Sequence, residues 1–142
     1  LRQHFYSKEL VHESLLLSNV LKLNDDEVRI ISQYYDNKFT NDQDFCRQIL
    51  QKYNLEVLIL TKGTEGSYVF TAQETSYQPT PKVHVADTVG AGDSFTASFI
   101  VSYLRGNHIA EAHQLAVEVS AYVCTQHGAM PQLPDLYLEL FK

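Results

Sequence analysis

Apolar residues recur every three or four positions along six segments, which is the spacing of an amphipathic helix. The six segments are residues 7–18, 24–34, 40–53, 94–104, 109–125 and 136–141. Ser7 is placed to cap the first of these helices, and Gly106 follows the fourth, where a glycine commonly ends a helix. The pattern therefore predicts a chain rich in helices with defined ends.

Four short runs between these helices predict β-strands. Residues 20–23 form a short strand, and residues 57–60 are continuously apolar, as in a buried parallel strand. Residues 68–70 and 75–77 predict a hairpin or meander at the edge of a sheet. Since strands and helices alternate, we expect an α/β fold with a mostly parallel sheet.

Charge and composition narrow the class of partner. The chain has 142 residues and a formal net charge of −6, from 11 Lys and Arg against 17 Asp and Glu. This balance disfavours nucleic acid or an anionic membrane as the main partner, because both require clustered basic residues. Cys46 and Cys124 match no metal-binding spacing and predict buried thiols in a reducing compartment. No apolar run approaches a membrane span, and no signal peptide is visible, so we expect a cytoplasmic protein.

The strongest chemical signal is the segment Asp-Thr-Val-Gly-Ala-Gly-Asp-Ser-Phe at residues 87–95. Its glycines predict a tight loop at 90–92 that opens a helix, so that several backbone N–H groups point outward where the helix dipole favours an anion. Asp93 is poorly placed to bind a phosphate, because like charges repel, and well placed to act as a base beside one. The alternative interpretation is an ordinary turn in which Asp93 caps the helix.

The segment 87–93 resembles the signature of the ribokinase-like sugar kinases, the phosphofructokinase-B family. Three further segments resemble motifs of that family, in the same order along the chain. They are residues 24–27, similar to its N-x-x-E motif, residues 61–66, similar to its nucleotide-contacting G-x-x-G turn, and Gly128 with Ala129, similar to its C-terminal glycine loop. Leu1 and Arg2 resemble the end of its D-x-N-x-R strand.

The resemblance implies a three-layer α/β/α fold, of which this chain supplies the C-terminal part. The only methionine is Met130, and the chain opens on Leu1, so we expect the N-terminal sugar-binding part and its lid to be absent from residues 1–142. The chain would then carry the nucleotide-binding and phosphoryl-transfer side of the kinase.

The resemblance also assigns roles in catalysis. It makes Asp93 the general base that takes the proton of a sugar hydroxyl as the hydroxyl attacks the γ-phosphate of ATP. The backbone N–H groups of Gly90, Ala91 and Gly92 would form the anion hole. Asn24 and Glu27 would reach a hydrated Mg²⁺ and its phosphates, since oxygen ligands through water suit that ion. The alternative for this pair is a capping box, which has the same spacing.

Two further sets of residues follow from the resemblance. Thr61, Gly63, Gly66 and Gly128 would contact the nucleotide, with Val117 against the adenine. Many family members carry an asparagine at the Val117 position, so this chain departs from the pattern there. The second set resembles two loops that hold a monovalent cation such as K⁺ in some relatives, largely through backbone carbonyls. It consists of Asp87, Val89, Val123, Gln126 and Gly128.

The resulting expectation is an ATP- and Mg²⁺-dependent carbohydrate kinase, fructokinase-like, acting on a small-molecule sugar. One alternative is a catalytically inactive nucleotide-binding or sensing protein with the same fold. Another is a kinase of the hydroxymethylpyrimidine/pyridoxal type. Dimerisation through the lid is common among relatives, so a homodimer is a further expectation, with neither nucleic acid nor membrane as a partner.

Overall fold

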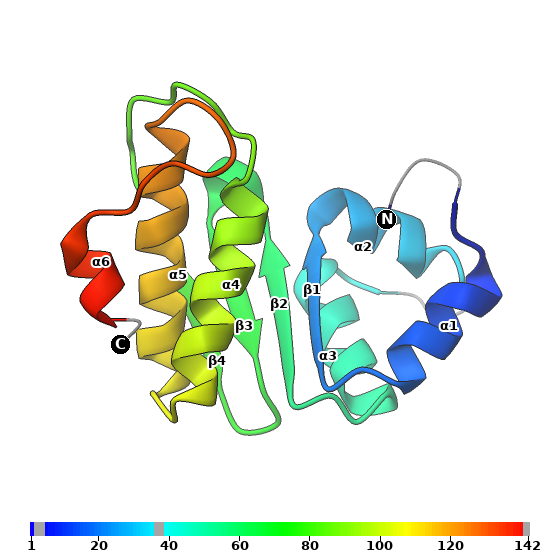
Figure 1. Cartoon of the computed structure of the whole chain (residues 1–142). Helices are drawn as coiled ribbons and strands as arrows, with labels where there is room; N and C mark the ends of the chain where they lie inside the picture. The colour runs from blue at the N-terminus through cyan, green and yellow to red at the C-terminus, as the bar shows by residue number, and fades with distance from the viewer. Residues whose placement is uncertain (2–4, 36–38, 141–142) are drawn as a thin grey trace. The chain divides into compact units, whose positions relative to one another are not determined.

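The computed structural model describes residues 1, 5–35 and 39–140 (Figure 1). The chain forms two compact units, Leu1–Tyr77 and Gln78–Lys142, and each is described by itself. Arg2, which resembles part of a family strand, and Phe141, the end of a predicted helix, lie outside the described residues.

The first unit is built on a four-stranded sheet. The strands β1 (Val20–Asn24), β2 (Val57–Thr61), β3 (Ser67–Phe70) and β4 (Thr75–Gln78) neighbour one another in that order. β1 and β2 are parallel, because two helices separate them in the chain, whereas β2 and β3 are antiparallel and are joined by a short turn. The four predicted strands and the α/β class are confirmed. The expected mostly parallel sheet is instead mixed, because the short turn between β2 and β3 makes that pair antiparallel, and β4 lies at the edge.

Three helices complete this unit: α1 (Lys8–Leu16), α2 (Asp25–Ser32) and α3 (Asp42–Lys52). Each begins after a side chain that accepts a hydrogen bond from the first turn, namely Ser7, Asn24 and Asn41. Such an N-cap contributes about 1 kcal/mol to helix stability. The three predicted helices are confirmed, each slightly shorter than the sequence pattern suggests.

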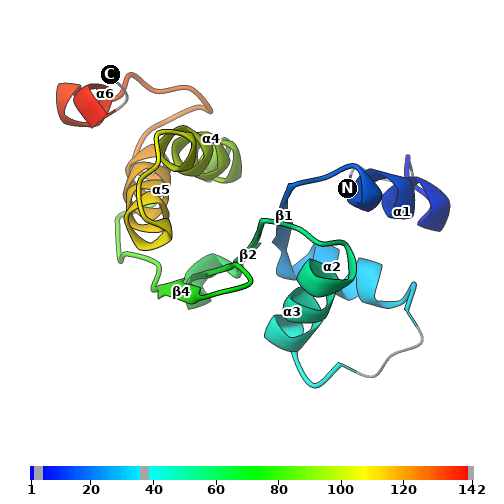
Figure 2. The same cartoon turned by 90° about the horizontal axis from the view of Figure 1, so that it is seen from below.

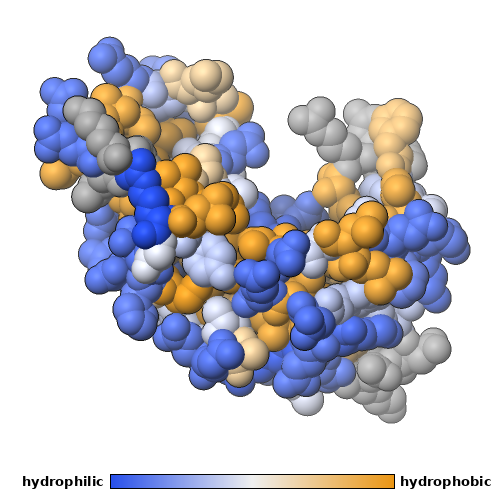
Figure 3. All heavy atoms as spheres, turned by 60° about the horizontal axis from the view of Figure 1, so that its bottom comes forward, coloured by the Kyte–Doolittle hydropathy of each residue, from blue (hydrophilic) through white to orange (hydrophobic). Residues whose placement is uncertain are grey.

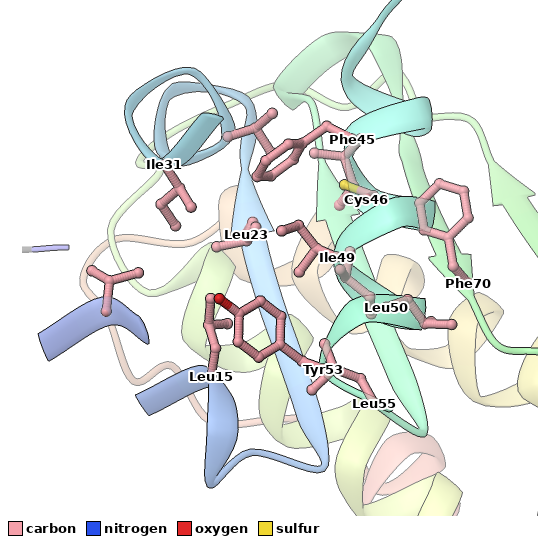
Figure 4. Packing of buried hydrophobic residues seen from close by; sticks show 14 residues of the cluster. Leu15, Leu23, Ile31, Phe45, Cys46, Ile49, Leu50, Tyr53, Leu55 and Phe70 are labelled. Carbon is pink, nitrogen blue, oxygen red and sulfur yellow. The ribbon is translucent and has the colours of Figure 1, made fainter. Parts of the chain in front are cut away.

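The core of the first unit lies between these helices and the sheet. In Figure 4, Leu15 of α1, Leu23 of β1 and Ile49 of α3 point toward one another. Cys46 is completely buried in the same cluster, and burial raises the pKa of its thiol to about 12. The predicted inert, buried thiol is confirmed for Cys46, whereas Cys124 in the second unit is only half-buried.

The second unit contains three helices: α4 (Ala91–Leu104), α5 (Ile109–Cys124) and α6 (Asp135–Leu140). α4 and α5 lie side by side (Figures 1 and 2). Phe95 and Phe99 of α4 are buried, as are Ala116 and His113 of α5. Gly106 has a φ of +84° and its N–H donates to the Tyr103 carbonyl at 2.9 Å, which confirms the predicted helix end.

The start of α4 differs from the sequence expectation. The helix begins at Ala91, three residues before the predicted start at 94, so that only Gly90 of the expected 90–92 loop precedes it. Gly90 has a φ of +83° and turns the chain into the helix by itself. Gly92 is tolerated in the first turn, where its N–H would lack an intrahelical partner in any case.

Apolar side chains also remain at the surface among polar ones (Figure 3). The most exposed are Leu17 and Phe5 in the first unit and Met130 and Leu104 in the second. Scattered exposure of this kind is ordinary for a folded protein. None of the described helices combines the length and apolar content that a membrane crossing requires.

Candidate active site

Two predicted site residues lie together at the carboxyl ends of neighbouring strands. Asn24 ends β1 and Thr61 ends β2, and the two residues are partners in the parallel register. The Thr61 hydroxyl donates to the Leu23 carbonyl at 3.5 Å, a long bond that joins the two strand ends. Ligands of α/β proteins bind outside this edge of the sheet, which makes it the candidate site of the first unit.

The capping box predicted as the alternative role of Asn24 and Glu27 is present. The Asn24 side-chain oxygen accepts the Glu27 N–H at 2.7 Å, and Glu27 Oε2 accepts the Asn24 N–H at 2.9 Å. Glu27 Oε1 lies 2.6 Å from the amino group of Leu1. The two side chains therefore start α2 at the same edge as Thr61, which does not exclude contact with a hydrated ion.

The side-chain oxygens of Asn24 and Glu27 can hold Mg²⁺ only through water and phosphate oxygens. Among the described residues no group of three His, Cys, Asp or Glu side chains is arranged to hold a metal directly. Mg²⁺ commonly keeps several waters and binds one or two carboxylates together with substrate phosphates. Glu27 and Asn24 fit an ion held in that manner, through water and phosphate oxygens.

The turn after β2 is shaped by two glycines in backbone conformations that other residues rarely adopt. Gly63 has a φ of +51° and Gly66 a φ of +108°, and the Gly66 carbonyl accepts the Lys62 N–H at 2.9 Å. A Cβ at Gly63 would meet nothing within 4 Å, so this side of the turn is open to a ligand.

Lys62 holds this turn to α3, a role the sequence analysis missed. Its ammonium lies 3.0 Å from Asp42 and 3.3 Å from Glu65. The hydrogen bond to Asp42 is the main reason why the pKa of Lys62 is raised. The position of Lys62 directly after a predicted strand was the only hint of this role in the sequence. Asp42, its partner in α3, lies 20 positions earlier, and that separation does not predict an ion pair.

In the second unit, the start of α4 carries the predicted catalytic residues. The Gly90 carbonyl accepts the Ser94 N–H at 2.8 Å, and the Ala91 N–H donates to Thr88 at 3.3 Å. Gly92 and Asp93 occupy the first turn, where backbone N–H groups have no intrahelical acceptor. The described residues supply no other acceptor for these two N–H groups, so Gly92 and Asp93 are better anion donors than Ala91.

The Asp93 side chain is exposed and has no hydrogen-bond partner among the described residues. The alternative in which Asp93 caps the helix therefore finds no support, because the helix start has no side-chain cap. A free carboxylate beside unpaired N–H groups can accept a proton from a group bound next to an anion.

Two loops are fastened together behind this helix start. Asp87 accepts the Val89 N–H at 3.0 Å through one carboxylate oxygen and the Gly128 N–H at 3.2 Å through the other. These bonds lower the pKa of Asp87. The Cys124 carbonyl, at the end of α5, accepts the Ala86 N–H at 2.9 Å. The carboxylate of Asp87 thus has a structural role that the sequence did not indicate.

Ser120 is another residue that the sequence analysis missed. Its hydroxyl, on α5, donates to the Ala91 carbonyl of α4 at 2.9 Å. The bond fixes the first turn of α4 against α5. A serine on the apolar side of a predicted helix is a weak signal, and nothing in the spacing identifies its partner.

The remaining predicted residues are distributed along α5 and its end. The Val123 carbonyl accepts the Gln126 N–H at 3.0 Å, and the Gln126 side chain donates to Thr125 at 2.8 Å. Val117 is half-exposed two turns earlier on α5, about 10 Å from the helix end. The structure therefore brings together the loops at Asp87 and Gly128, with Val117 farther along the helix.

Comparisons with known proteins identify the family of the chain. Residues 1–136 match the model of the pfkB family carbohydrate kinases. The chain is 30% identical over 130 residues to a fructokinase of Escherichia coli, covering 87% of this chain and 41% of that protein. It is 32% identical over 131 residues to an aminoimidazole riboside kinase of Salmonella typhimurium, covering 89% of this chain and 39% of that protein.

A solved structure shows the same fold. It is the crystal structure of the aminoimidazole riboside kinase of Salmonella enterica, complexed with aminoimidazole riboside and an ATP analogue. The match covers 99% of this chain and 49% of the kinase, with a TM-score of 0.77 and 27% sequence identity. The chain spans about two fifths of the length of the two curated relatives. The family match, which includes the loops and the helix start described above, shows that the chain belongs to the pfkB family of carbohydrate kinases, with a ribokinase-like fold.

Proposed function

We propose that the chain supplies the nucleotide-binding and phosphoryl-transfer part of an ATP-dependent kinase that phosphorylates a sugar hydroxyl. The observation that carries this proposal is the start of α4. There the exposed, unbonded carboxylate of Asp93 lies in the same helical turn as the unpaired N–H groups of Gly92 and Asp93.

In the proposed reaction Asp93 is the general base. Its carboxylate accepts the proton of the sugar hydroxyl, the hydroxyl oxygen forms a bond to the γ-phosphorus of ATP, and the bond to the bridging oxygen breaks to release ADP. The N–H groups of Gly90 and Gly92, joined by that of Asp93, stabilise the negative charge of the transferring group, whereas the Ala91 N–H of the expected anion hole already donates to the Thr88 carbonyl. The φ of Gly90 and the bond from Ser120 to Ala91 support this role, because a preorganised anion hole requires a fixed backbone.

The nucleotide contacts are proposed from the same fold. Thr61, Gly63 and Gly66 would contact the nucleotide in the first unit, and Gly128 and Val117 in the second. Asn24 and Glu27 would hold Mg²⁺ through water, and the bound ion supplies positive charge that offsets the phosphates.

We further propose a binding site for a monovalent cation such as K⁺. The cation would bind backbone carbonyls at Asp87, Val89, Val123, Gln126 and Gly128. The bonds from Asp87 to the Val89 and Gly128 N–H groups support it, because they hold both loops in one arrangement. Homodimerisation and a cytoplasmic location stay predictions of the sequence.

Fructose is the first substrate to test. The matched relatives include a fructokinase and an aminoimidazole riboside kinase, so the substrate class extends from free sugars to ribosides. A panel should therefore contain fructose, ribose and a purine nucleoside beside one another.

The test is sugar-dependent release of ADP from Mg-ATP by the full-length protein, with the sugar-binding part included, and by its Asp93→Asn variant. Loss of the base is expected to lower kcat by about 10²- to 10⁴-fold while nucleotide binding remains. Asp135→Asn is the matched control, because Asp135 also lies in the first turn of a helix, α6, outside the proposed site. Equal rates for Asp93→Asn and the unaltered protein would overturn the assignment of the base.

A further inference from the structure

A polar cavity lies in the first unit, at the end opposite to Thr61. Its volume is about 380 Å³, and Lys8, His12, Tyr35, Lys52 and Tyr53 are among the residues that line it. Small-molecule pockets have volumes of roughly 300–1,000 Å³. Lys52 and Tyr53 end α3 shortly before β2 begins, whereas Thr61 ends β2, so the cavity and the proposed nucleotide contacts lie at opposite ends of that strand.

A chain of hydrogen bonds runs along one wall of the cavity. His12 Nδ1 lies 2.8 Å from the Tyr53 hydroxyl, which lies 2.7 Å from the Tyr35 hydroxyl. Each phenol has a single proton, so the bonds run in one direction. If Tyr35 donates to Tyr53 and Tyr53 to His12 Nδ1, the His12 proton is on Nε2, and that N–H is left to donate to a ligand. In the reverse direction the Tyr35 hydroxyl is left instead.

The cavity is lined by basic side chains. Lys8 and Lys52 line it together with His12, and none of the described residues that line it is acidic. In the part of the chain that the structure describes, neither ammonium forms an ion pair. Lys52 Nζ lies 4.6 Å from the centre of the Tyr35 ring, which orients the ammonium without neutralising it. The protein as a whole has a net charge of −6, so the positive charge of these lysines is opposite in sign to that of the whole chain.

Lys8 adds an electrostatic argument. It is the first residue of α1, whose N-terminus already has a positive partial charge. A lysine in this position is unfavourable for the helix itself. Lys8, the end of the helix dipole and Lys52 all favour an anion in the same cavity.

We propose that this cavity binds a small phosphate monoester, about the size of a sugar phosphate. Two ammonium groups and the free donor of the hydrogen-bond chain match the three oxygens of a phosphate dianion. The rings of Tyr34, Tyr35 and Tyr53 border the remaining space, which a sugar ring can occupy. The proposal does not depend on the kinase activity, because it concerns binding at the other end of β2.

Titration of the isotope-labelled chain with ribose 5-phosphate, inorganic phosphate and ribose, followed by NMR, tests the proposal. The two phosphates are expected to shift the amide signals of residues 8–12 and 52–53 in a saturable manner, and ribose is not. Tighter binding of ribose 5-phosphate than of inorganic phosphate would identify the monoester as the preferred ligand, and the reverse order would overturn that part.

The double variant Lys8→Gln/Lys52→Gln is expected to weaken binding by at least about tenfold. Lys82→Gln, which changes an exposed lysine of the second unit, is the matched control and should leave binding unchanged. Equal affinity in the double variant, or shifts confined to residues 90–93 at the start of α4, would overturn the proposal. The second of these results would leave the proposed function intact, so the two failures are distinguishable.

Discussion

Gly90 lies against the backbone of Ala129. A Cβ at Gly90 would lie 2.5 Å from the Ala129 carbonyl oxygen, and the φ of Gly90 is +83°. The residue that precedes α4 and the C-terminal glycine loop therefore approach more closely than any side chain allows. The two segments resemble two separate family motifs, and in the structure they form one junction.

Gly90→Ala should consequently destabilise the second unit. The left-handed conformation costs an alanine about 1–2 kcal/mol, and displacing the Ala129 backbone adds about 1–3 kcal/mol. We expect the free energy of unfolding, measured with urea and circular dichroism, to fall by at least about 2 kcal/mol.

Gly106→Ala is the matched control for this change. Gly106 has nearly the same φ, +84°, but a Cβ there meets nothing within 4 Å. It should lose only the conformational part, about 1–2 kcal/mol. If both variants lose the same amount, the contact between Gly90 and Ala129 does not contribute to stability.

Ser120→Ala removes the bond that holds the first turn of α4 to α5. A single hydrogen bond of this kind contributes about 1 kcal/mol to stability. Under the proposed function, kcat should also decrease, because the N–H groups of the first turn lose a fixed position. Ser14→Ala is the control, since the Ser14 hydroxyl donates only to a carbonyl of its own helix, Leu10, at 2.8 Å. A decrease in stability without any change in kcat would limit Ser120 to a structural role.

The starts of the helices show what the sequence could and could not predict. The helix starts at Ser7 and Asn24 and the buried strand at 57–60 depend on local signals, namely capping side chains and apolar runs, and they were predicted correctly. The start of α4 was placed too late, because the glycines at 90 and 92 were both interpreted as a loop. Glycine disfavours helix interiors, but this argument does not apply to the first turn.

The contacts around the site could not be predicted for a different reason. Ser120 bonds Ala91 across 29 positions, and Asp87 bonds Gly128 across 41. Such pairs result from the packing of whole elements, and no spacing in a single sequence encodes them. The resemblance to the family placed Asp87 in a loop expected to hold a monovalent cation, but its carboxylate binds two backbone N–H groups, a role that depends on how the loops fold together.

His113 should make the second unit sensitive to acid. It is completely buried, and burial lowers its pKa from 6.5 to about 4. The unfolded chain therefore binds a proton between pH 6.5 and 4 that the folded chain does not. The corresponding stability is fully present above pH 6.5 and is lost as the pH falls toward 4, by about 3 kcal/mol in total.

His113→Gln is expected to flatten this dependence when unfolding free energies are compared between pH 7 and pH 4. The difference between the two proteins isolates His113 from the other titrating groups. His84→Gln, at an exposed position, should retain the slope of the unaltered protein. If His113→Gln retains that slope as well, the acid sensitivity has another source.

Glu27→Gln separates the two roles of the pair at the start of α2. A glutamine can still accept the Asn24 N–H, so the capping box survives. The free energy of unfolding should change by at most about 1 kcal/mol, because the hydrogen bonds of the cap remain in place. Under the proposed function, however, the substitution removes a charge that would attract hydrated Mg²⁺, and the Mg²⁺ concentration for half-maximal rate should rise by about tenfold. The control variant is Glu27→Ala, which removes the cap as well and should lose stability in addition.

An unchanged Mg²⁺ requirement in Glu27→Gln would mean that Glu27 acts only as a cap, because the substitution removes its charge and leaves its hydrogen bond in place.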